Sequence, residues 1–542
     1  MKNLLKKKKC AVALLVALGV ATPSGYAATV PQNIKLATIQ NLVKSNGAEP
    51  ASLDPHKIEG DVESNITTDL FEGLTQHDPQ GHIIPGVATH WQSNDNKLWV
   101  FQLRNNAKWS DGSPVTAQDF VYSWRRIVDP KTASPYASYL QDAHLLNAAE
   151  IISGKKDKSM LGVKALDDHT LQVTLSEPVS YFPAMTAHYA MQPVNHTVVE
   201  KYGDKWTLPQ HYVSNGAYTL KDWVVNERIV LVRNPHYWDN AHTLINQVTF
   251  LPISGVADVN RYQAGEVDIT SGIPLELFHH LKTETPQQVH VAPILCTGYY
   301  EMNNQRPPLN DVRVREALKL GLDRDIIVHK VLNQGQREAF SFTPPYTHGI
   351  ALKPPAWFTW TQQQRNQLAK KLLAEAGYGP THPLRLQLLY NTNEQNKKVA
   401  IAAAAIWKKN IGIDVQLRNQ EWKTFLDARH QGNFELARAG WCADYNEPSS
   451  FLNIMLSDSS NNTAHYRSDA FDHIMAQALR TTNEVGRAAI YQRAEQQLDQ
   501  DSVTIPIWYA VNARLVKPFV GGYSGQDPLN YVYDKNLYIR AH

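Results

Sequence analysis

Residues 384–439 alternate between strand-like and helix-like segments, and this alternation limits the fold more than any other feature of the 542-residue chain. Residues 384–390 (LRLQLLY) predict a strand, and residues 392–395 (TNEQ) match a capping box at the start of a helix. Residues 414–418 and 434–439 predict two more strands, with a second helix over 421–430 between them. Because the connections are short, we expect a parallel sheet with right-handed crossovers, and hence an α/β protein.

The segment that follows the third of these strands has the composition of a binding site. It contains Gly440, Trp441, Cys442, Asp444 and Tyr445. In parallel sheets ligands bind beyond the carboxyl ends of the strands. We therefore predict a ligand site here; the alternative is an ordinary turn in which the aspartate is a structural cap.

Other segments fill out a large protein of several domains. Apolar or alternating runs predict strands over 99–103, 170–175, 229–232, 248–251 and 267–270. Helical periodicity covers 312–332, 365–376 (stopped by Gly377) and 485–498. No flexible linker separates these segments, so we expect domains that pack closely and a chain that crosses between them more than once.

Residues 1–27 have the pattern of an export signal. Five lysines, Lys2 and 6–9, precede an 11-residue apolar run at 10–20, and residues 25–27 (GYA) resemble a cleavage site before Ala28. The alternative is an uncleaved anchor, but a bilayer span needs about 20 apolar residues. Without these 27 residues the chain has 48 basic and 51 acidic side chains, which disfavours nucleic acid as a partner.

Two cysteines remain after the signal, Cys296 and Cys442. An even number of cysteines in an oxidising compartment predicts a disulfide, with two buried free thiols as the alternative. Both cysteines follow apolar, strand-like runs, so their side chains can meet if the two strands are neighbours in one sheet.

The common catalytic and cofactor motifs are absent from the sequence. There is no phosphate-binding GxxxxGK[ST] loop, no GxGxxG after a strand, no HExxH and no CxxC. Residues 522–525 (GYSG) fall one residue short of a nucleophile elbow, and His279 and His280 are adjacent and cannot chelate together on a helix. We expect no cofactor, no metal and no enzymatic activity, although catalytic triads can assemble from distant positions.

An ordered series of motifs resembles the peptide, nickel and opine class of solute-binding proteins, which serve ATP-driven importers. The series comprises residues 69–74 (DLFEGL), 86–91, 99–104 (WVFQLR) and 108–124 (KWSDGSPVTAQDFVYSW). Segments 52–60, 132–140, 215–218, 419–425 and 438–448 resemble the oligopeptide-binding branch of this class, with the murein-peptide-binding branch as a near relative. Cys296 and Cys442 match the disulfide positions of the oligopeptide branch.

This resemblance implies a periplasmic binding protein-like fold (class II, cluster C) with two lobes, a hinge and an extra inserted domain. Domain I would comprise 28–71, 196–295 and 512–542, domain II the insertion 72–195, and domain III 296–511. The resemblance also implies a monomeric periplasmic protein that delivers short peptides to a membrane permease with ATPase subunits.

The resemblance further assigns roles to particular residues. Asp444 matches the position that pairs with the ligand's α-amine, and Arg429 and Arg438 match positions for its carboxylate. The remaining implied site residues are main-chain partners near Glu59 and Gly440–Cys442, the aromatic Tyr136, Trp422 and Trp441, and the polar Asn391 and Asn396. The alternatives are a structural cap for the aspartate, internal ion pairs for the arginines and core positions for the aromatics.

Two positions depart from the oligopeptide branch. Leu332 and Asn396 stand where that branch has a lysine and a histidine that reach ligand carboxylates. We therefore expect a shifted preference for ligand length. Within the class the rival ligands are a murein tripeptide, a nickel chelate or haem; outside it, the rivals are a secreted hydrolase and a holdase for unfolded chains.

Overall fold

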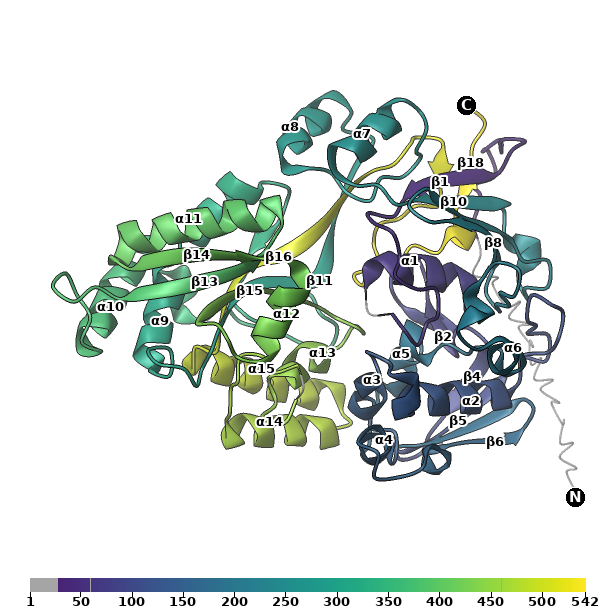
Figure 1. Cartoon of the computed structure of the whole chain (residues 1–542), viewed down its shortest axis with the longest axis horizontal. Coiled ribbons are helices and arrows are strands. Elements are labelled where there is room, and N and C mark those ends of the chain that lie inside the picture. Colours follow the sequence, from purple (N-terminus) through teal and green to yellow (C-terminus); the bar gives the residue numbers. More distant parts are fainter. Residues whose placement is uncertain (1–27, 59, 460) are drawn as a thin grey trace, which may run out of the picture.

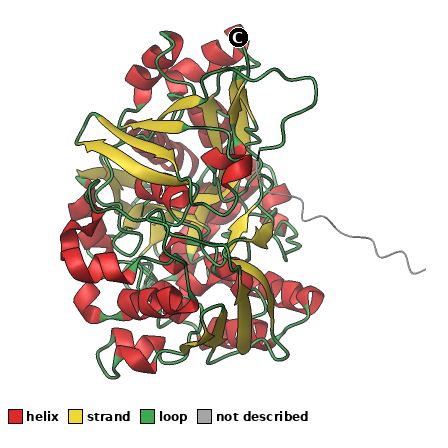
Figure 2. Ribbon diagram, turned by 90° about the vertical axis from the view of Figure 1, so that its right-hand side faces the viewer, coloured by secondary structure: helices red, strands yellow, loops and turns green. Residues whose placement is uncertain are grey.

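The computed structural model describes residues 28–58, 60–459 and 461–542, so the export signal lies outside the described residues. Figure 1 shows two lobes. Lobe 1, on the right, contains two four-stranded sheets, and lobe 2, on the left, contains one six-stranded sheet. The view at right angles in Figure 2 shows strands and helices distributed along the whole length of the molecule.

Lobe 1 is built on a sheet that joins distant parts of the chain. Its strand order is β1-β10-β9-β8, in which β1 runs parallel to β10 and the other pairs are antiparallel. The bounds are β1 (Asn41–Ser45), β8 (Tyr218–Val224), β9 (Arg228–Arg233) and β10 (Gln247–Leu251). The short pair β17 (Val520–Gly521) and β18 (Tyr538–Ile539) brings the C-terminal segment back to this lobe.

The second sheet of lobe 1 lies within residues 72–195. Its antiparallel order is β4-β5-β7-β6, with the hairpin of β2 and β3 beside it. The strands are β2 (Thr75–His77), β3 (Ile83–Pro85), β4 (Ala88–Gln92), β5 (Leu98–Leu103), β6 (Val163–Asp167) and β7 (Thr170–Thr174). The helices of lobe 1 are α1 (Asp61–Leu70), α2 (Ala117–Val128), α3 (Ser138–Asp142), α4 (Ala148–Ile152), α5 (Phe182–Met185) and α6 (His196–Tyr202).

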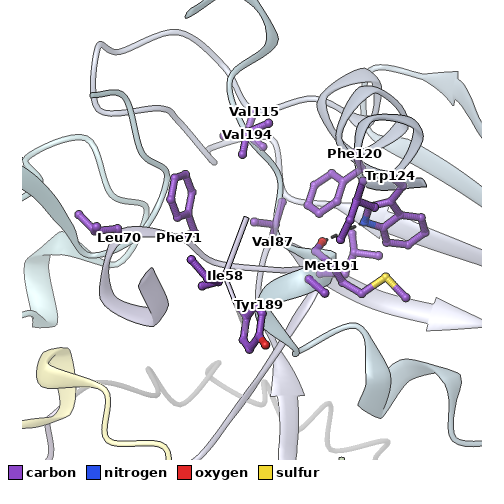
Figure 3. Packing of buried hydrophobic residues seen from close by; sticks show 14 of the residues in the cluster. Ile58, Leu70, Phe71, Val87, Val115, Phe120, Trp124, Tyr189, Met191 and Val194 are labelled. Atoms are coloured by element: carbon purple, nitrogen blue, oxygen red, sulfur yellow. Dashed lines mark hydrogen bonds between the residues drawn. The ribbon is translucent and has the colours of Figure 1, made fainter. Parts of the chain in front are cut away.

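One continuous hydrophobic core joins the two sheets of lobe 1. It extends from Leu42 on β1 to Phe250 on β10 and includes Phe120 and Trp124 of α2. Figure 3 shows this packing, in which the indole Nε1 of Trp124 donates a hydrogen bond of 2.9 Å to the carbonyl of Met191. Burying these large side chains fixes residues 72–195 firmly against the rest of the lobe.

Lobe 2 contains the strand–helix alternation predicted from the sequence. Strands β13 (Arg385–Asn391), β14 (Asp414–Gln420) and β15 (Leu436–Cys442) are parallel, as expected, and α11 (Glu394–Ile411) and α12 (Trp422–His430) connect them. The sheet continues as β12-β16-β11-β15-β13-β14 with antiparallel β11 (Val289–Met302), β16 (Thr504–Leu515) and β12 (Arg337–Glu338).

Helices cover both faces of this sheet. One core contains residues of α9 (Val312–Gly321), α10 (Gln362–Glu375) and α11, and a second contains residues of α13 (Ser449–Leu452), α14 (Asp469–Arg480) and α15 (Glu484–Gln500). The neighbours Tyr299 and Tyr300 on β11 enter opposite cores, because successive strand side chains point to opposite faces.

The chain passes between the lobes along β11 and β16. Their antiparallel pairing runs from Val289 with Leu515 to Glu301 with Thr504, with an irregularity between Pro293 and Thr297. In Figure 1 these two strands lead from lobe 2 toward α7 (Gly255–Gln263), α8 (Leu275–Glu284) and lobe 1. The chain therefore passes between the lobes once along β11 and once along β16.

The structure corrects several details of the sequence-based prediction. Residues 267–270 do not form a full strand; the segment hydrogen-bonds to Val43 and Ser45 on one side and to Leu515 on the other, but Ile269 alone forms bridges, with Lys44 and Val516. The helix predicted over 312–332 is interrupted after Gly321 and resumes as a π-helix over Ile326–Leu332. The predicted capping box is wrong: Asn393 is the N-cap of α11, and Thr392 bonds to Asn419.

Strand β15 also extends further than predicted. It ends at Cys442, so Gly440 and Trp441 lie within the strand and not beyond it. Cys442 stands directly opposite Cys296 of β11, and the two form the disulfide that the cysteine count predicted. The bond ties the end of β15 to the strand that leads to lobe 1.

Candidate functional site

Two cavities meet at Asp444 between the lobes. The smaller has a volume of about 230 Å³ and is lined by residues of α1, β11, β15 and the segment Pro528–Tyr531. The larger, about 350 Å³, extends toward α3, α12 and α13. Both are lined by Gly60, Tyr136, Trp441 and Asp444, so the aspartate predicted from the sequence lies where the two cavities join.

Asp444 follows β15 and is held in place by groups from both lobes. Its main-chain amide donates to the hydroxyl of Ser450 at 2.9 Å, and the phenol of Tyr136 in lobe 1 donates to its carboxylate at 2.9 Å. The carboxylate is 19% exposed. Burial, with smaller contributions from the charges of Asp142 and Asp61, raises the pKa of Asp444 to about 7, against the lowering effect of the Tyr136 hydrogen bond.

Among the described residues, no lysine or arginine forms an ion pair with this carboxylate. The closest basic group is His188, whose Nε2 lies 3.7 Å from the carboxylate oxygen. Burial lowers the pKa of His188 to about 3, so the imidazole is neutral at physiological pH. Its ring stacks between Tyr136 and Tyr139 at centroid distances of 5.2 Å and 4.4 Å. Asp444 is therefore an anion without a partner cation, which is the arrangement that attracts a cationic ligand group.

Strand β15 has a free edge beside the cavities. It pairs with β11 over its full length, but among the described residues it pairs with β13 only at Leu436 and Ala437. Residues 438–442 therefore have no strand neighbour on that side. Gly440 and Cys442 are exposed there, and such an edge can accept an extended peptide as an additional strand.

The two predicted arginines lie in different environments. Arg429 on α12 makes a 2.9 Å ion pair with the buried Glu301 and donates to Thr463 at 3.0 Å. Arg438 on β15 has no hydrogen-bond or ion-pair partner among the described residues, and its Nε is buried without an acceptor. Burial, together with the charge of Arg429, lowers the pKa of Arg438 to about 10. Arg438 is therefore the arginine whose donors lack a protein partner, although neither arginine lines the two cavities.

The aromatic side chains form walls rather than core. Trp441 lines both cavities and donates its indole N–H to the carbonyl of Ser450 at 2.7 Å. Trp422 lines the larger cavity, is 49% exposed and stacks on Phe425 at 5.7 Å. A half-exposed tryptophan on a cavity wall offers apolar contact area to a ligand side chain.

The remaining predicted residues do not line the two cavities, and one of them lies outside the described residues. Asn396 donates to Asn391 at 2.9 Å, and this pair does not line either cavity. Leu332 is buried in the core of lobe 2. Glu59 lies outside the described residues, although Gly60 beside it lines both cavities.

Sequence reasoning did not identify several residues of the site. His188, Asp142 and Asn530 line the cavities, and Glu301 holds Arg429. They come from four separate segments, and none stands in a motif. The sequence contained no signal that could have brought them together.

The candidate metal ligands in the described part of the chain lie away from the two cavities. Within the described residues, Asp325, His329 and Glu338 are the group whose ligand atoms converge, within 4.8 Å of one another, and none of them lines the two cavities. In the described part of the chain, no helix combines the length and apolar character that a membrane crossing requires.

Two lobes joined by long strands, with cavities between them, define an α/β periplasmic binding protein fold. The sequence profile of the bacterial extracellular solute-binding proteins, family 5 (middle) matches residues 82–463, and the chain belongs to this family.

Individual relatives share most of the chain. It is 62% identical over 544 residues to the periplasmic oligopeptide-binding protein OppA of Salmonella typhimurium, covering 100% of both proteins. It is 48% identical to the periplasmic murein peptide-binding protein MppA of Escherichia coli, over 95% of this chain and 96% of that protein. The crystal structure of Haemophilus influenzae OppA in complex with RPPGFSPFR has a TM-score of 0.84 and 49% identity, covering 94% of this chain and 100% of that one. The relatives are binding proteins, not enzymes.

Proposed function

We propose that this protein is the periplasmic substrate-binding component of an ABC peptide importer, and that it captures short peptides between its two lobes. The observation that carries the proposal is the unneutralised carboxylate of Asp444 at the junction of two cavities. A peptide amino terminus supplies the missing positive charge. The similarity to an oligopeptide-binding protein and to a murein peptide-binding protein supports the same class of ligand.

Asp444 holds the ligand's ammonium group in this proposal. Tyr136 donates to one carboxylate oxygen and fixes its orientation, while the ammonium approaches the remaining acceptor positions. A charge-assisted hydrogen bond in a poorly solvated site is stronger than the same bond in water. The ammonium group of the ligand therefore supplies the positive charge that the protein does not place beside Asp444.

The free edge of β15 binds the ligand backbone. Main-chain hydrogen bonds to residues 438–442 would extend the sheet by one strand without reading side-chain identity. The ligand side chains then enter the two cavities beside Trp441 and Trp422. This arrangement accounts for broad sequence tolerance.

Arg438 receives the ligand carboxylate at the other end of the same strand. Arg438 and Asp444 are six positions apart, and β15 ends at Cys442, so about 20 Å at roughly 3.3 Å per residue is an upper limit on their separation. Because Arg429 is already paired with Glu301, Arg438 is the guanidinium whose donors are not used by a protein carboxylate. Its planar fork suits a bidentate carboxylate.

The preferred length of the peptide ligand depends on Leu332 and Asn396, the two positions that differ from the oligopeptide-binding branch. Leu332 is buried in a core and Asn396 is bonded to Asn391, so neither offers a cation to shorter or longer ligands. We expect calorimetry with alanine peptides of two to five residues to show one preferred length. Equal affinity across the series would contradict this expectation.

The domain division belongs to the same proposal. Domain I comprises 28–71, 196–295 and 512–542, domain II comprises 72–195, and domain III comprises 296–511. The pairing of β11 with β16 supports a hinge at the passage between domains I and III. Closure about this hinge would enclose the peptide.

Blocking the ligand's amino terminus tests the proposal. Trialanine should bind, and N-acetyl-trialanine should bind at least about 100-fold more weakly, because acetylation removes the cation that Asp444 needs. Mass analysis after long incubation should return trialanine intact, whereas a hydrolase would release shorter products. Equal binding of the two peptides would instead favour a holdase for unfolded chains.

The identity to MppA supports a second ligand within the class, a murein tripeptide. Such a ligand also presents an amine and carboxylates to Asp444 and Arg438. Competition between a murein tripeptide and trialanine in the same titration would establish which of the two binds more tightly.

A further inference from the structure

A third and larger cavity lies between the lobes. Its volume is about 650 Å³, and it is lined on one side by residues 141–150 of lobe 1 and on the other by residues between Ser449 and Tyr491 of lobe 2. In Figure 1 these walls are α3 and α4 facing α13 and α14 at the lower middle of the molecule. None of the family motifs in the sequence falls on these walls.

This cavity adjoins the proposed peptide site. Asp142, Ser449, Asn453 and Ser459 line both it and the 350 Å³ cavity that contains Asp444. A ligand whose amino terminus is held at Asp444 therefore has space to extend a long side chain into the third cavity.

The charges of this cavity have one sign. Four acidic residues line it, and no lysine or arginine is among the described lining residues. Two of the acids are engaged: Glu150 lies 3.3 Å from Lys156, and Asp472 accepts a hydrogen bond from the amide of Ser457. The other two, Asp142 and Asp458, have no hydrogen-bond or ion-pair partner among the described residues.

Asp142 and Asp458 line the cavity from opposite lobes. Asp142 ends α3 in lobe 1, and Asp458 follows α13 in lobe 2. Burial and, to a smaller extent, the charge of Asp458 raise the pKa of Asp142 to about 7. The two carboxylates repel each other across the cleft unless a cation lies between them.

We propose that this third cavity is a subsite for a basic ligand side chain, an ammonium or guanidinium close to the amino terminus of the bound peptide. The inference rests on the proposed peptide-binding function. The cation lies between Asp142 and Asp458 and converts their repulsion into attraction across the cleft. A basic side chain therefore adds both affinity and a preference for the closed arrangement of the lobes.

The apolar part of the wall fits the same ligand. Leu145, Met475 and Leu479 line the cavity beside the acids. A lysine or arginine side chain has a methylene stem that packs on such a surface while its charged end reaches the carboxylates. A neutral side chain of equal length would retain the apolar contact and lose the charge.

The experiment compares lysine with norleucine, which keeps the chain length and removes the charge. Calorimetric titrations use Lys-Ala-Ala, Ala-Lys-Ala and their norleucine counterparts. The wild-type protein should bind at least one lysine peptide about tenfold more tightly than its counterpart, a ratio that corresponds to a charged hydrogen bond. Raising the ionic strength should reduce that ratio, because salt screens charges in an open cavity.

Two variants locate the effect. Asp142→Asn should reduce the lysine-to-norleucine ratio to less than about twofold while leaving the affinity for the norleucine peptides unchanged or higher. Glu150→Gln is the matched control, because this acid lines the same cavity but is paired with Lys156, and it should leave the ratio unchanged.

The outcomes separate this inference from the peptide-binding proposal. A wild-type ratio near one, or a ratio that survives Asp142→Asn, overturns the basic subsite while trialanine binding still supports the wider function. If none of these peptides binds, including trialanine, the proposed function itself fails.

Discussion

The carboxylate of Asp444 lies in the proposed peptide site without an ion-pair partner of permanent positive charge among the described residues. Acids such as Glu301 and Glu447 are buried against arginines at 2.9 Å and are stable as ion pairs. Asp444 instead has a phenol and a neutral imidazole as neighbours. Its pKa of about 7 reflects a charge that the folded protein leaves uncompensated. Such a residue costs stability in the free protein and gains it when a cation binds.

Replacing this residue tests the role directly. Asp444→Asn keeps the size of the side chain and a carbonyl acceptor for Tyr136 but removes the negative charge. We expect at least about 100-fold weaker binding of trialanine, with an unchanged circular dichroism spectrum. Glu394→Gln, an exposed acid on α11, should bind as the wild type does. Wild-type affinity in Asp444→Asn would remove the basis of the proposed function.

The raised pKa of Asp444 predicts a pH dependence of binding. The ligand's ammonium stabilises the ionised carboxylate, so affinity should weaken as pH falls below about 7. Binding near pH 6 should release a proton, which calorimetry in buffers of different ionisation enthalpy detects. The Asp444→Asn variant should release less. An affinity that is flat between pH 8 and pH 5 would contradict this assignment.

The raised pKa of Asp444 also affects the stability of the ligand-free protein. Ligand affinity increases as pH rises, whereas the stability contributed by Asp444 decreases. The folded pKa of about 7 exceeds the ordinary value of 3.8, so between these values the native state binds more protons than the unfolded state. The contribution of Asp444 to the free energy of unfolding therefore decreases as pH rises from about 4 to 7. Asp444→Asn should be more stable than the wild type at pH 8, by an amount that shrinks toward pH 4.

The arginines should respond to substitution in opposite ways. Arg438→Met removes a buried cation without a partner, so we expect about 1 kcal/mol of added stability together with weaker peptide binding. Arg429→Met leaves the buried Glu301 unpaired and should cost roughly 3–5 kcal/mol. Chemical denaturation measures both. Similar destabilisation in the two variants would show that Arg438 has a structural partner.

At the level of elements, sequence periodicity predicted the order of lobe 2 well. The alternation over 384–439 identified β13, α11, β14, α12 and β15, because each has its own hydrophobic pattern and short connections. The pattern could not locate the free edge of β15, which depends on how far β13 diverges from it. It also predicted a full strand over 267–270, because an apolar run does not show how many residues of the segment pair with their neighbours.

The site was predictable only in part, because local sequence patterns do not show which distant segments the fold brings together. Asp444, Tyr136 and Trp441 stand in segments that resemble a family, whereas Asp142 and His188 lie where the topology of lobe 1 happens to place them. The position of Asn393 as the cap of α11 differs from the predicted box by one residue. Local motifs tolerate such shifts, because several polar side chains can satisfy the same amides.

The free edge of β15 makes a prediction about ligand backbones. N-methylation of a central amide of trialanine removes one donor and adds bulk at the strand edge. We expect about tenfold or weaker binding. The control is a peptide that keeps every backbone N–H but has a bulkier central side chain, such as Ala-Leu-Ala. It should bind about as well as trialanine. If N-methylation has no effect, the ligand does not bind as an added strand.

For the whole molecule, the lobes already touch at a few points around the site. The guanidinium of Arg487 in lobe 2 donates to Ser180 of lobe 1 at 3.0 Å, and Tyr181 stacks on Tyr445 at 5.6 Å. The phenol of Tyr136 also reaches across to Asp444 at 2.9 Å, and the chain itself connects the lobes along β11 and β16. Three cavities between the lobes therefore lie in a region where small rotations change their volume.

Ligand binding should make the molecule more compact. We expect the radius of gyration from small-angle X-ray scattering to decrease when trialanine is added at saturating concentration, because the peptide bridges both lobes. N-acetyl-trialanine at the same concentration should leave the radius unchanged. An equal decrease with both peptides would mean that closure does not depend on the contact at Asp444.

Lobe 1 joins the two ends of the described chain. Gln40 exchanges two hydrogen bonds of 2.8 Å with the main chain of Ile539, the amide of Ala541 bonds to Lys35, and the buried Lys44 pairs with Asp534 at 2.9 Å. The N-terminal segment of the lobe consequently lacks these contacts until the ribosome has translated residues 534–541. We therefore expect the nascent polypeptide to remain unfolded during translation, which is the state in which a secretion channel accepts its cargo.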